Sequence, residues 1–124
     1  MSNYTSFSTA ETNPDLDIIE DVSPDEVNAK KESLTLIDVR GADEYVGELG
    51  HIADSKLITL DTLMDHIDDI PKDKTVVFVC RSGRRSANAT AIAKDNGFES
   101  AFNMKGGMML WNEMGLATEG KSSE

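Results

Sequence analysis

The residues best suited to chemistry lie in one short segment around the only cysteine of the chain. Three arginines follow this cysteine within five residues, in the order Cys80-Arg81-Ser82-Gly83-Arg84-Arg85-Ser86. Residues 75–79, before it, are mostly apolar and β-branched, which predicts a buried central strand. Residues 85–96 predict a helix rich in alanine. A loop between the carboxyl end of a strand and the start of a helix directs backbone N–H groups into one concavity, where anions are favoured.

This setting favours the thiolate form of Cys80, because the helix N-terminus and the arginines both stabilise negative charge. We therefore interpret Cys80 as a catalytic nucleophile. A buried and inert cysteine is the structural alternative, but it does not explain three arginines so close to one thiol. The residues expected to bind substrate form the rest of the loop: Arg81, Ser82, Gly83, Arg84, Arg85 and Ser86.

The length of the loop distinguishes two thiolate chemistries. Cysteine enzymes of phosphoryl transfer need an arginine at the sixth position after the cysteine, so that the loop holds a tetrahedral phosphate with the arginine forked onto its oxygens. In this chain the sixth position is Ser86, and Arg85 is one residue short. The shorter loop favours a smaller reacting atom such as sulfur, which leaves a cysteine phosphatase or arsenate reductase as the weaker alternative.

Composition excludes several classes of protein. The formal net charge is −11, which argues against nucleic-acid binding and against docking on an anionic membrane. Residues 74–94 contain five basic and no acidic residues, so the only positive segment surrounds the thiol. A single cysteine excludes an intrachain disulfide and a cysteine-cluster metal site, and it fits a reducing compartment. Without a signal-peptide pattern or a long apolar stretch, we expect a soluble, cytoplasmic monomer.

The rest of the chain predicts the elements that position this loop. Its 124 residues predict one domain at 17–119, a flexible N-terminal extension at 1–16 and a flexible tail at 120–124. Strands are expected at 34–39, 56–60, 75–79 and 100–103, and helices at 24–31, 42–48, 61–70, 85–96 and 107–114. The alternation predicts an α/β, three-layer domain with a central, mainly parallel sheet flanked by helices. Ser23, Pro24 and Glu26 predict a capping box at the first helix.

Several motifs in register resemble the rhodanese family of sulfurtransferases, in the form of a single-domain member. The resemblance covers roughly residues 18–118 and is carried by Leu36-Ile37-Asp38-Val39-Arg40 with Glu44-Tyr45, by Gly50-His51-Ile52, by the loop from Cys80 to Ser86, and by Gly106-Gly107 with Trp111 and Gly115. The chain departs from the family pattern at Asp54, where a small residue or glycine is usual, and at Ala117, where proline is common.

The resemblance implies a mechanism with a covalent intermediate. The Cys80 thiolate takes the outer sulfur of a small anionic donor such as thiosulfate, and the resulting persulfide passes it to a cyanide or thiol acceptor, which includes protein thiols. No metal and no organic cofactor is implied. A rhodanese-fold module that only binds or regulates is the competing hypothesis.

The resemblance and the order of the loop also suggest a role for each residue. Backbone N–H groups of the loop cradle the outer sulfur, and Ser86 caps the helix or hydrogen-bonds the sulfur. Arg81 and Arg84 face the donor, and Arg85 can turn back to a carboxylate. Asp38 and Arg40 end a neighbouring strand at the same edge; we favour a bracing ion pair over a contact between Arg40 and substrate.

Overall fold

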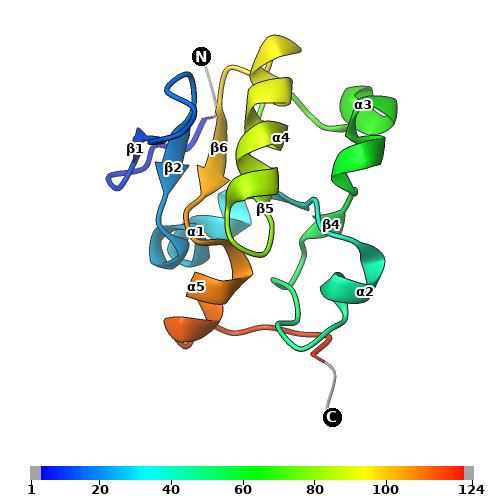
Figure 1. Ribbon diagram of the computed structural model, residues 1–124. Coiled ribbons are helices and arrows are strands. Elements are labelled where there is room, and N and C mark those ends of the chain that lie inside the picture. Colours follow the sequence, from blue (N-terminus) through cyan, green and yellow to red (C-terminus); the bar gives the residue numbers. More distant parts are fainter. Residues whose placement is uncertain (1–3, 122–124) are drawn as a thin grey trace.

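The computed structural model describes residues 4–121 and contains one six-stranded sheet in the order β1-β2-β6-β5-β3-β4 (Figure 1). Only the β1–β2 pair is antiparallel, so the sheet is mainly parallel, as the alternating sequence pattern predicts. The strands are β1 Glu11–Thr12, β2 Glu20–Val22, β3 Leu34–Asp38, β4 Lys56–Leu57, β5 Thr75–Val79 and β6 Ala101–Met104.

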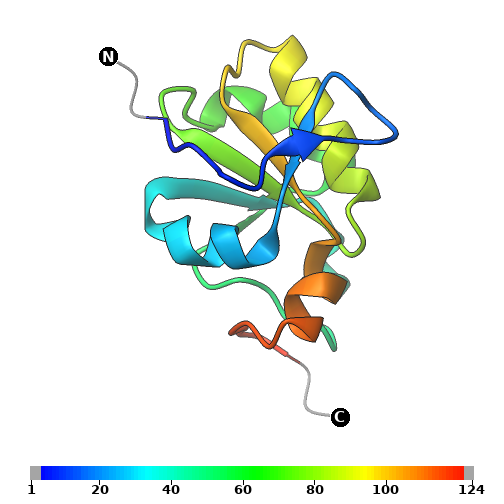
Figure 2. The same cartoon turned by 90° about the vertical axis from the view of Figure 1, so that its left-hand side faces the viewer.

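Helices cover both faces of this sheet and make the three expected layers. The α-helices are α1 Pro24–Lys30, α2 Ala42–Tyr45, α3 Leu63–His66, α4 Arg84–Asp95 and α5 Gly107–Glu113, and short 3-10 turns occupy Lys31–Ser33, Leu60–Thr62 and Ile67–Asp69. Figure 2 shows α1 and α5 on one side of the sheet and α4 on the other.

The sheet has one hydrophobic core on each face. The central strand β5 contributes to both cores, because its successive side chains point to opposite faces of the sheet. Val76 and Phe78 pack with the side chains of α3 and α4, whereas Val77 and Val79 pack with those of α1 and α5. All five residues of β5 are buried, which accounts for its continuous apolar sequence. The strand therefore ends at a rigid position, and the next residue is Cys80.

One predicted helix is divided in the structure. The segment 61–70 forms the 3-10 turn Leu60–Thr62, then α3, then the 3-10 turn Ile67–Asp69, because Thr62 and His66 take backbone angles outside the helical region. The apolar positions of the pattern are nevertheless the buried ones. The prediction of one continuous helix was wrong.

The predicted capping box at α1 is also wrong. Ser23 stands at the N-cap, but its side chain makes no capping hydrogen bond. The Glu26 carboxylate instead accepts hydrogen bonds from Ser8 and Thr9 and pairs with Lys30 at 2.8 Å. The Glu26 carboxylate therefore binds the N-terminal segment and does not cap the start of its own helix.

Residues 4–16, which the sequence led us to expect as a loose extension, make specific contacts with the domain. The β1 strand extends the sheet at its edge, and the ring of Phe7 meets that of Phe102 edge-on at 5.1 Å between centroids. Of the predicted tail, Gly120 lies against the ring of His51. Residues 1–3 and 122–124 of these two segments lie outside the described residues. Every helix in the described chain is too short or too polar to cross a membrane.

Candidate active site

The Cys80 thiol lies at the base of the loop between β5 and α4. Its residue is only 1% exposed, and its Sγ accepts a hydrogen bond from the backbone N–H of Gly83 at 3.0 Å and one from the Ser86 hydroxyl at 3.2 Å. Gly83 has a φ of 104°, a left-handed conformation that glycine adopts without strain. The loop can therefore turn its N–H back onto the sulfur, and both donors stabilise a thiolate.

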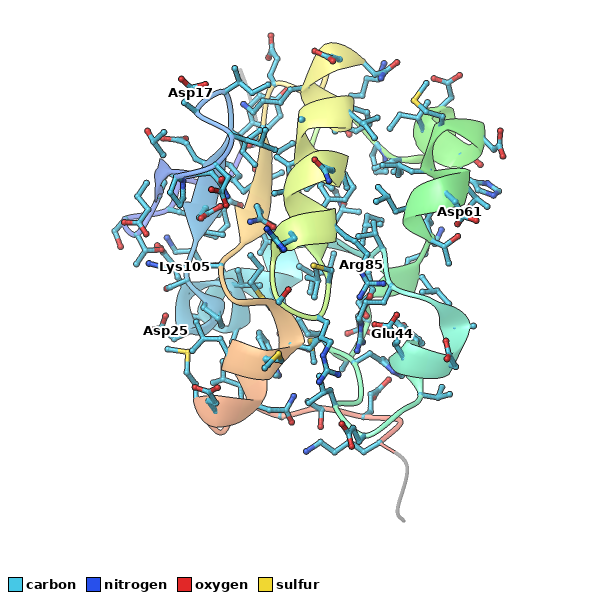
Figure 3. All side chains as sticks on the ribbon, in the orientation of Figure 1. Asp17, Asp25, Glu44, Asp61, Arg85 and Lys105 are labelled. Atoms are coloured by element: carbon cyan, nitrogen blue, oxygen red, sulfur yellow. The ribbon has the colours of Figure 1, made fainter. Side chains whose placement is uncertain are left out.

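Three arginines of the loop take different positions. Arg85 turns back onto Glu44 of α2, with Nη1–Oε2 and Nη2–Oε1 distances of 2.9 and 2.7 Å (Figure 3). Arg81 and Arg84 are exposed on the rim, and neither forms an ion pair with any described residue. The loop thus keeps two cations available to an anion, while the third holds α2 against the loop.

The ion pair between Arg85 and Glu44 shifts the pKa of both side chains. The hydrogen bonds from Arg85 lower the pKa of Glu44 from 4.5 to about 2, against the opposing effect of burial. The pKa of Arg85 is raised, first by the hydrogen bonds to Glu44 and then by the negative charges of Glu44, Cys80 and Asp38. The negative charges of the Glu44 carboxylate and of the Cys80 thiolate therefore both act on the Arg85 guanidinium.

Asp38 and Arg40 form a buried ion pair beside this loop. Each is 1% exposed, and the Arg40 Nη2 lies 2.8 Å from the Asp38 carboxylate. The remaining donors of Arg40 bind the backbone carbonyls of Glu44 at 3.1 Å and Gly50 at 2.7 Å. Each nitrogen of this guanidinium has a protein partner, and the side chain is buried and holds the turn after α2 onto the end of β3, so the geometry favours the bracing role over a contact with substrate.

The start of α5 packs against the backbone of the cysteine loop. The N–H groups of Met108 and Met109 donate to the carbonyls of Cys80 and Arg81 at 2.8 and 3.0 Å. A Cβ atom on Gly107 would lie only 2.4 Å from the Cys80 oxygen and 2.5 Å from the Arg81 carbonyl group. Sequence reasoning noted Gly106-Gly107 only as part of a resemblance; the structure shows that a glycine is required for this close approach.

A buried polar network that the sequence reasoning missed extends from the thiol to the sheet edge. The Ser86 hydroxyl has the Cys80 Sγ and the Asn103 Oδ1 as two alternative acceptors for its one proton, and the Asn103 Nδ2 donates to Asp21 at 2.9 Å. Ser86, Asn103 and Asp21 are all buried, at 0%, 1% and 5% exposure. The available signal was the polar Asn103 within the apolar strand β6, because a buried amide must find partners.

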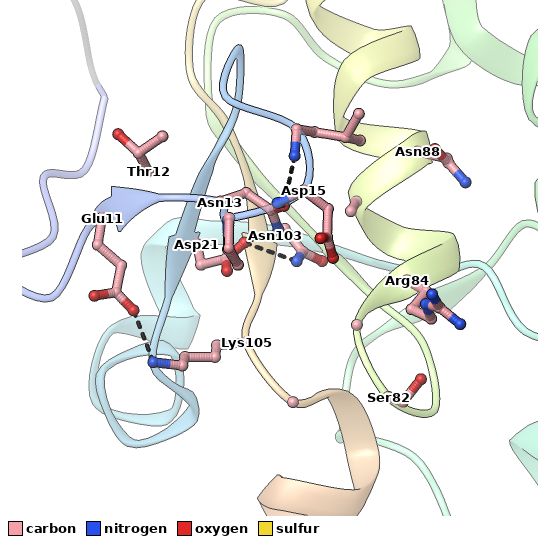
Figure 4. A pocket seen from close by; sticks show the side chains of 15 residues that line it. Glu11, Thr12, Asn13, Asp15, Asp21, Ser82, Arg84, Asn88, Asn103 and Lys105 are labelled. Atoms are coloured by element: carbon pink, nitrogen blue, oxygen red, sulfur yellow. Dashed lines mark hydrogen bonds and ion pairs between the residues drawn. The ribbon is translucent and has the colours of Figure 1, made fainter.

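A cavity of about 590 Å³ lies beside the loop and contains part of this network (Figure 4). Residues 11–16 of the N-terminal segment form one wall, and residues 82–84 of the loop form another. Within residues 4–121, no group of three or more His, Cys, Asp or Glu side chains is arranged to hold a metal ion.

Comparison with known proteins agrees with this geometry. A Bacillus subtilis protein, YtwF, is 42% identical over 80 residues, which cover 64% of this chain and 75% of that protein. The thiosulfate sulfurtransferase GlpE of Pseudomonas syringae is 33% identical over 91 residues, 73% of this chain and 84% of GlpE. The crystal structure of a rhodanese-related protein from Thermoplasma volcanium superposes with a TM-score of 0.73 at 26% identity, covering 78% of this chain and 94% of that one. The Rhodanese-like domain family itself matches residues 23–114, which include the cysteine loop, its bracing pairs and the start of α5, so this chain is a member of that family.

Proposed function

We propose that this protein is a sulfurtransferase that carries sulfur as a Cys80 persulfide. The observation that carries the proposal is the environment of the Cys80 Sγ. The sulfur accepts hydrogen bonds from the Gly83 N–H in the loop and from the Ser86 hydroxyl in the first turn of α4. Hydrogen-bond donors arranged in this way around the sulfur suit a thiolate and one added sulfur atom. The sulfurtransferase name of a relative such as GlpE supports the same reaction class.

The first half-reaction loads the cysteine. The Cys80 thiolate attacks the outer sulfur of a donor such as thiosulfate, a new S–S bond forms, and the bond to the sulfonate sulfur breaks with its electron pair leaving on sulfite. The exposed guanidinium groups of Arg81 and Arg84 attract the dianionic donor. The backbone N–H groups at the start of α4 then face the persulfide.

The second half-reaction unloads it. An acceptor thiolate attacks the outer sulfur, the S–S bond to Cys80 breaks, and its electron pair returns to the Cys80 thiolate. The product is an acceptor persulfide, or thiocyanate when cyanide is the acceptor. The exchange needs no redox cofactor because the electrons stay with the sulfur atoms. A single thiol fits a reducing compartment, and the proposal places the protein in the cytoplasm.

Mass spectrometry of the intact protein tests the proposal. After incubation with thiosulfate, the wild type is expected to gain the mass of one sulfur atom and to lose it on addition of cyanide. Sulfate, a dianion of similar shape without a transferable sulfur, is the matched control and should add nothing. A Cys80→Ser protein should show no gain with either anion.

Two other outcomes of these experiments would contradict the proposed reaction. If the folded wild type gains no sulfur from thiosulfate or from a low-molecular-weight persulfide, the proposal is refuted and the loop is a binding site without transfer chemistry. If Cys80→Ser turns over at the wild-type rate, another group performs the reaction.

A further inference from the structure

A chain of hydrogen bonds beside the cysteine loop fixes the direction in which the Ser86 hydroxyl can donate. At the far end of this chain, the Asn13 Oδ1 accepts hydrogen bonds from the backbone N–H groups of Asp15 and Leu16 at 2.8 and 2.9 Å. Because backbone N–H groups only donate, the Asn13 amide has one allowed orientation. Its Nδ2 therefore faces Asp21 and donates to the Oδ1 of that carboxylate at 2.8 Å.

Asp21 in turn fixes the orientation of Asn103 (Figure 4). The Asn103 Nδ2 donates to the Asp21 Oδ1 at 2.9 Å. Because a carboxylate has no proton to donate, the amide nitrogen of Asn103 must point toward it, and the amide oxygen must point the other way, toward Ser86. Asp21, Asn103 and Ser86 are 5%, 1% and 0% exposed, so water does not compete for these groups.

The Ser86 hydroxyl therefore meets two acceptors with one proton. They are the Asn103 Oδ1 and the Cys80 Sγ, which lies 3.2 Å from the hydroxyl oxygen. A neutral sulfur is a weak acceptor, so the hydroxyl donates to Asn103 while Cys80 is a thiol or a persulfide. A thiolate is a stronger acceptor than a neutral amide, so the hydroxyl turns to the sulfur when negative charge forms there. The proton stays on Ser86 throughout.

We propose that Asn103 is a positioning residue for sulfur transfer, which binds the Ser86 hydroxyl while the Cys80 sulfur is neutral and competes with the thiolate for it. The inference rests on the proposed function where it concerns the persulfide. In the unloading step, the acceptor thiolate forms an S–S bond with the outer sulfur, and the bond to Cys80 breaks with its electron pair on Sγ. The hydroxyl then turns from the amide to that sulfur. Asn103 thus favours the loaded cysteine over the free thiolate.

Asn103→Leu tests this role, because leucine has a similar shape but offers the Ser86 hydroxyl no acceptor. Alkylation of Cys80 by iodoacetamide is followed by mass over a range of pH, without any sulfur donor. We expect the rate near neutral pH to rise roughly fivefold, the size of one ordinary hydrogen bond, and the rate reached at high pH to stay the same. An equal rise at every pH would show easier access to the thiol and would overturn the inference.

A second substitution decides whether Asn103 acts through the hydroxyl. In Ser86→Ala there is no hydroxyl to share, so adding Asn103→Leu should leave the alkylation rate unchanged. Thr90→Val is the matched control: the buried Thr90 hydroxyl donates to the Ser86 carbonyl at 2.8 Å, so its loss removes a hydrogen bond to the same residue but not to its side chain. Its pH profile should match the wild type. A rise that persists in Ser86→Ala, or that Thr90→Val reproduces, would refute the positioning role.

Asp21→Asn keeps the inference testable if Asn103→Leu does not fold. An amide at position 21 can donate as well as accept, so Asn103 can turn its nitrogen toward Ser86 and lose its hold on the hydroxyl. We expect a smaller rise in alkylation, absent in the Ser86→Ala background. Loss of the Asp21 charge also favours the thiolate directly, but that effect persists in Ser86→Ala; a rise of equal size in both backgrounds would contradict the inference. The charge of Arg85 interacts with those of the cysteine and of Asp38, and these groups are the same in every variant.

Release of sulfur extends the test to the transfer itself. Protein preloaded with thiosulfate and freed of excess donor is mixed with cyanide, and the loss of the added sulfur is followed by mass. Asn103→Leu should unload faster than wild type, because the departing Cys80 sulfur gains a hydrogen bond for which no other acceptor competes. In the Ser86→Ala background the substitution should make no difference.

The two readouts keep failure of this inference distinct from failure of the proposed function, because alkylation needs no persulfide. If no persulfide forms but alkylation depends on Asn103 only when Ser86 is present, the transfer reaction is refuted and the positioning role stands. If the persulfide forms and this dependence is absent, the positioning role is refuted alone.

Discussion

Ser86 has one hydroxyl proton and two acceptors within reach, the Cys80 Sγ and the Asn103 Oδ1. A thiolate is a stronger acceptor than a neutral amide, so ionisation of Cys80 draws the proton toward the sulfur. The amide cannot turn its nitrogen toward Ser86, because the Asp21 carboxylate only accepts and holds the Asn103 Nδ2 on the far side. The hydroxyl is thus positioned to stabilise the thiolate form of Cys80.

Removing this donor should slow reactions of the thiolate. In Ser86→Ala we expect alkylation of Cys80 by iodoacetamide near neutral pH to slow about tenfold, the effect of one lost hydrogen bond to a charged group. Ser82→Ala is the matched control, because Ser82 is exposed on the same loop and its side chain makes no hydrogen bond with a described residue. Equal rates in wild type and Ser86→Ala would show that the hydroxyl serves Asn103 alone.

The Glu44–Arg85 pair predicts a pH dependence of stability. The pKa of Glu44 is lowered to about 2 in the folded protein by the hydrogen bonds from Arg85. A lowered carboxyl pKa gives stabilisation that is complete above the unfolded value of 4.5 and is lost as pH falls toward the folded value. Because both side chains are partly exposed, we expect Glu44→Gln to cost about 1 kcal/mol near neutral pH.

Urea unfolding of wild type and Glu44→Gln checks this expectation. The difference in the free energy of unfolding should shrink to a small fraction between about pH 7 and about pH 2.5. Glu48→Gln, at an exposed acid nearby, should give no difference at either pH. A Glu44→Gln difference that persists in acid would mean that the pair is held by packing rather than by charge.

At the scale of elements, the cysteine loop depends on α5 as much as on α4. Gly107 leaves no room for a Cβ beside the carbonyls of Cys80 and Arg81, and the N–H groups of Met108 and Met109 bind those same carbonyls. The loop is therefore fixed from one side by its own strand and helix and from the other by the last helix. Neither contact involves a side chain that reacts.

Gly107→Ala is expected to disrupt this arrangement. Its Cβ would lie 2.4 Å from the Cys80 backbone oxygen, so the loop or α5 must move, and we expect a loss of about 3 kcal/mol or more of stability together with slower persulfide formation. Gly115→Ala is the matched control: its φ of 73° is also positive, but no atom lies within 4 Å of an added Cβ, so it should cost only about 1 kcal/mol. Urea unfolding and the rate of sulfur loading measure both effects. Similar losses in the two variants would show that backbone conformation, not the close contact, is what matters.

The elements differ in how well the sequence predicts them. The strand β5 matches its prediction and α4 matches within one residue, because a continuous β-branched run and a following Gly83 are strong local signals. The strands β1 and β2 were not predicted: they have two and three residues, carry acids, and pair only through tertiary contacts. Asp54 takes a φ of 70°, a conformation that glycine adopts without strain, which fits the small residue or glycine expected at that position of the family.

The same limit applies to the site. The candidate nucleophile, its loop and the Asp38–Arg40 pair follow from local order and charge. Glu44 as the partner of Arg85 does not, because the two residues are 41 positions apart. The roles of Asn103 and Asp21 depend on β6 lying beside β2 in the sheet. Residues that are 82 positions apart in the chain meet there. No local pattern predicts such a contact without an alignment of the strands.

At the scale of the whole molecule, Glu26 joins the N-terminal segment to the domain. Its carboxylate accepts hydrogen bonds from the backbone and the hydroxyl groups of Ser8 and Thr9 and pairs with Lys30. Burial alone would raise the pKa of Glu26, but the hydrogen bonds from Lys30, Thr9 and Ser8 together hold it well below its ordinary value. This one carboxylate orders the chain that leads into β1 and the acidic wall of the cavity.

Glu26→Gln should therefore loosen the segment without unfolding the domain. We expect a loss of about 1–2 kcal/mol of stability and faster cleavage within residues 4–12 by a nonspecific protease, read by mass. Glu32→Gln, at an exposed acid with no hydrogen bond or ion pair to a described residue, should behave like wild type. Equal cleavage in all three proteins would show that the sheet pairing of β1 alone holds the segment.

The contact between α5 and the cysteine loop also ties the thiol to the C-terminal part of the fold. The N–H groups of Met108 and Met109 bind the carbonyls of Cys80 and Arg81, which come much earlier in the chain. Because a small domain folds as one cooperative unit, the loop has this support only when the C-terminal part of the domain is in place. A truncated chain that ends before Gly107 would therefore lack the backbone support of its own cysteine.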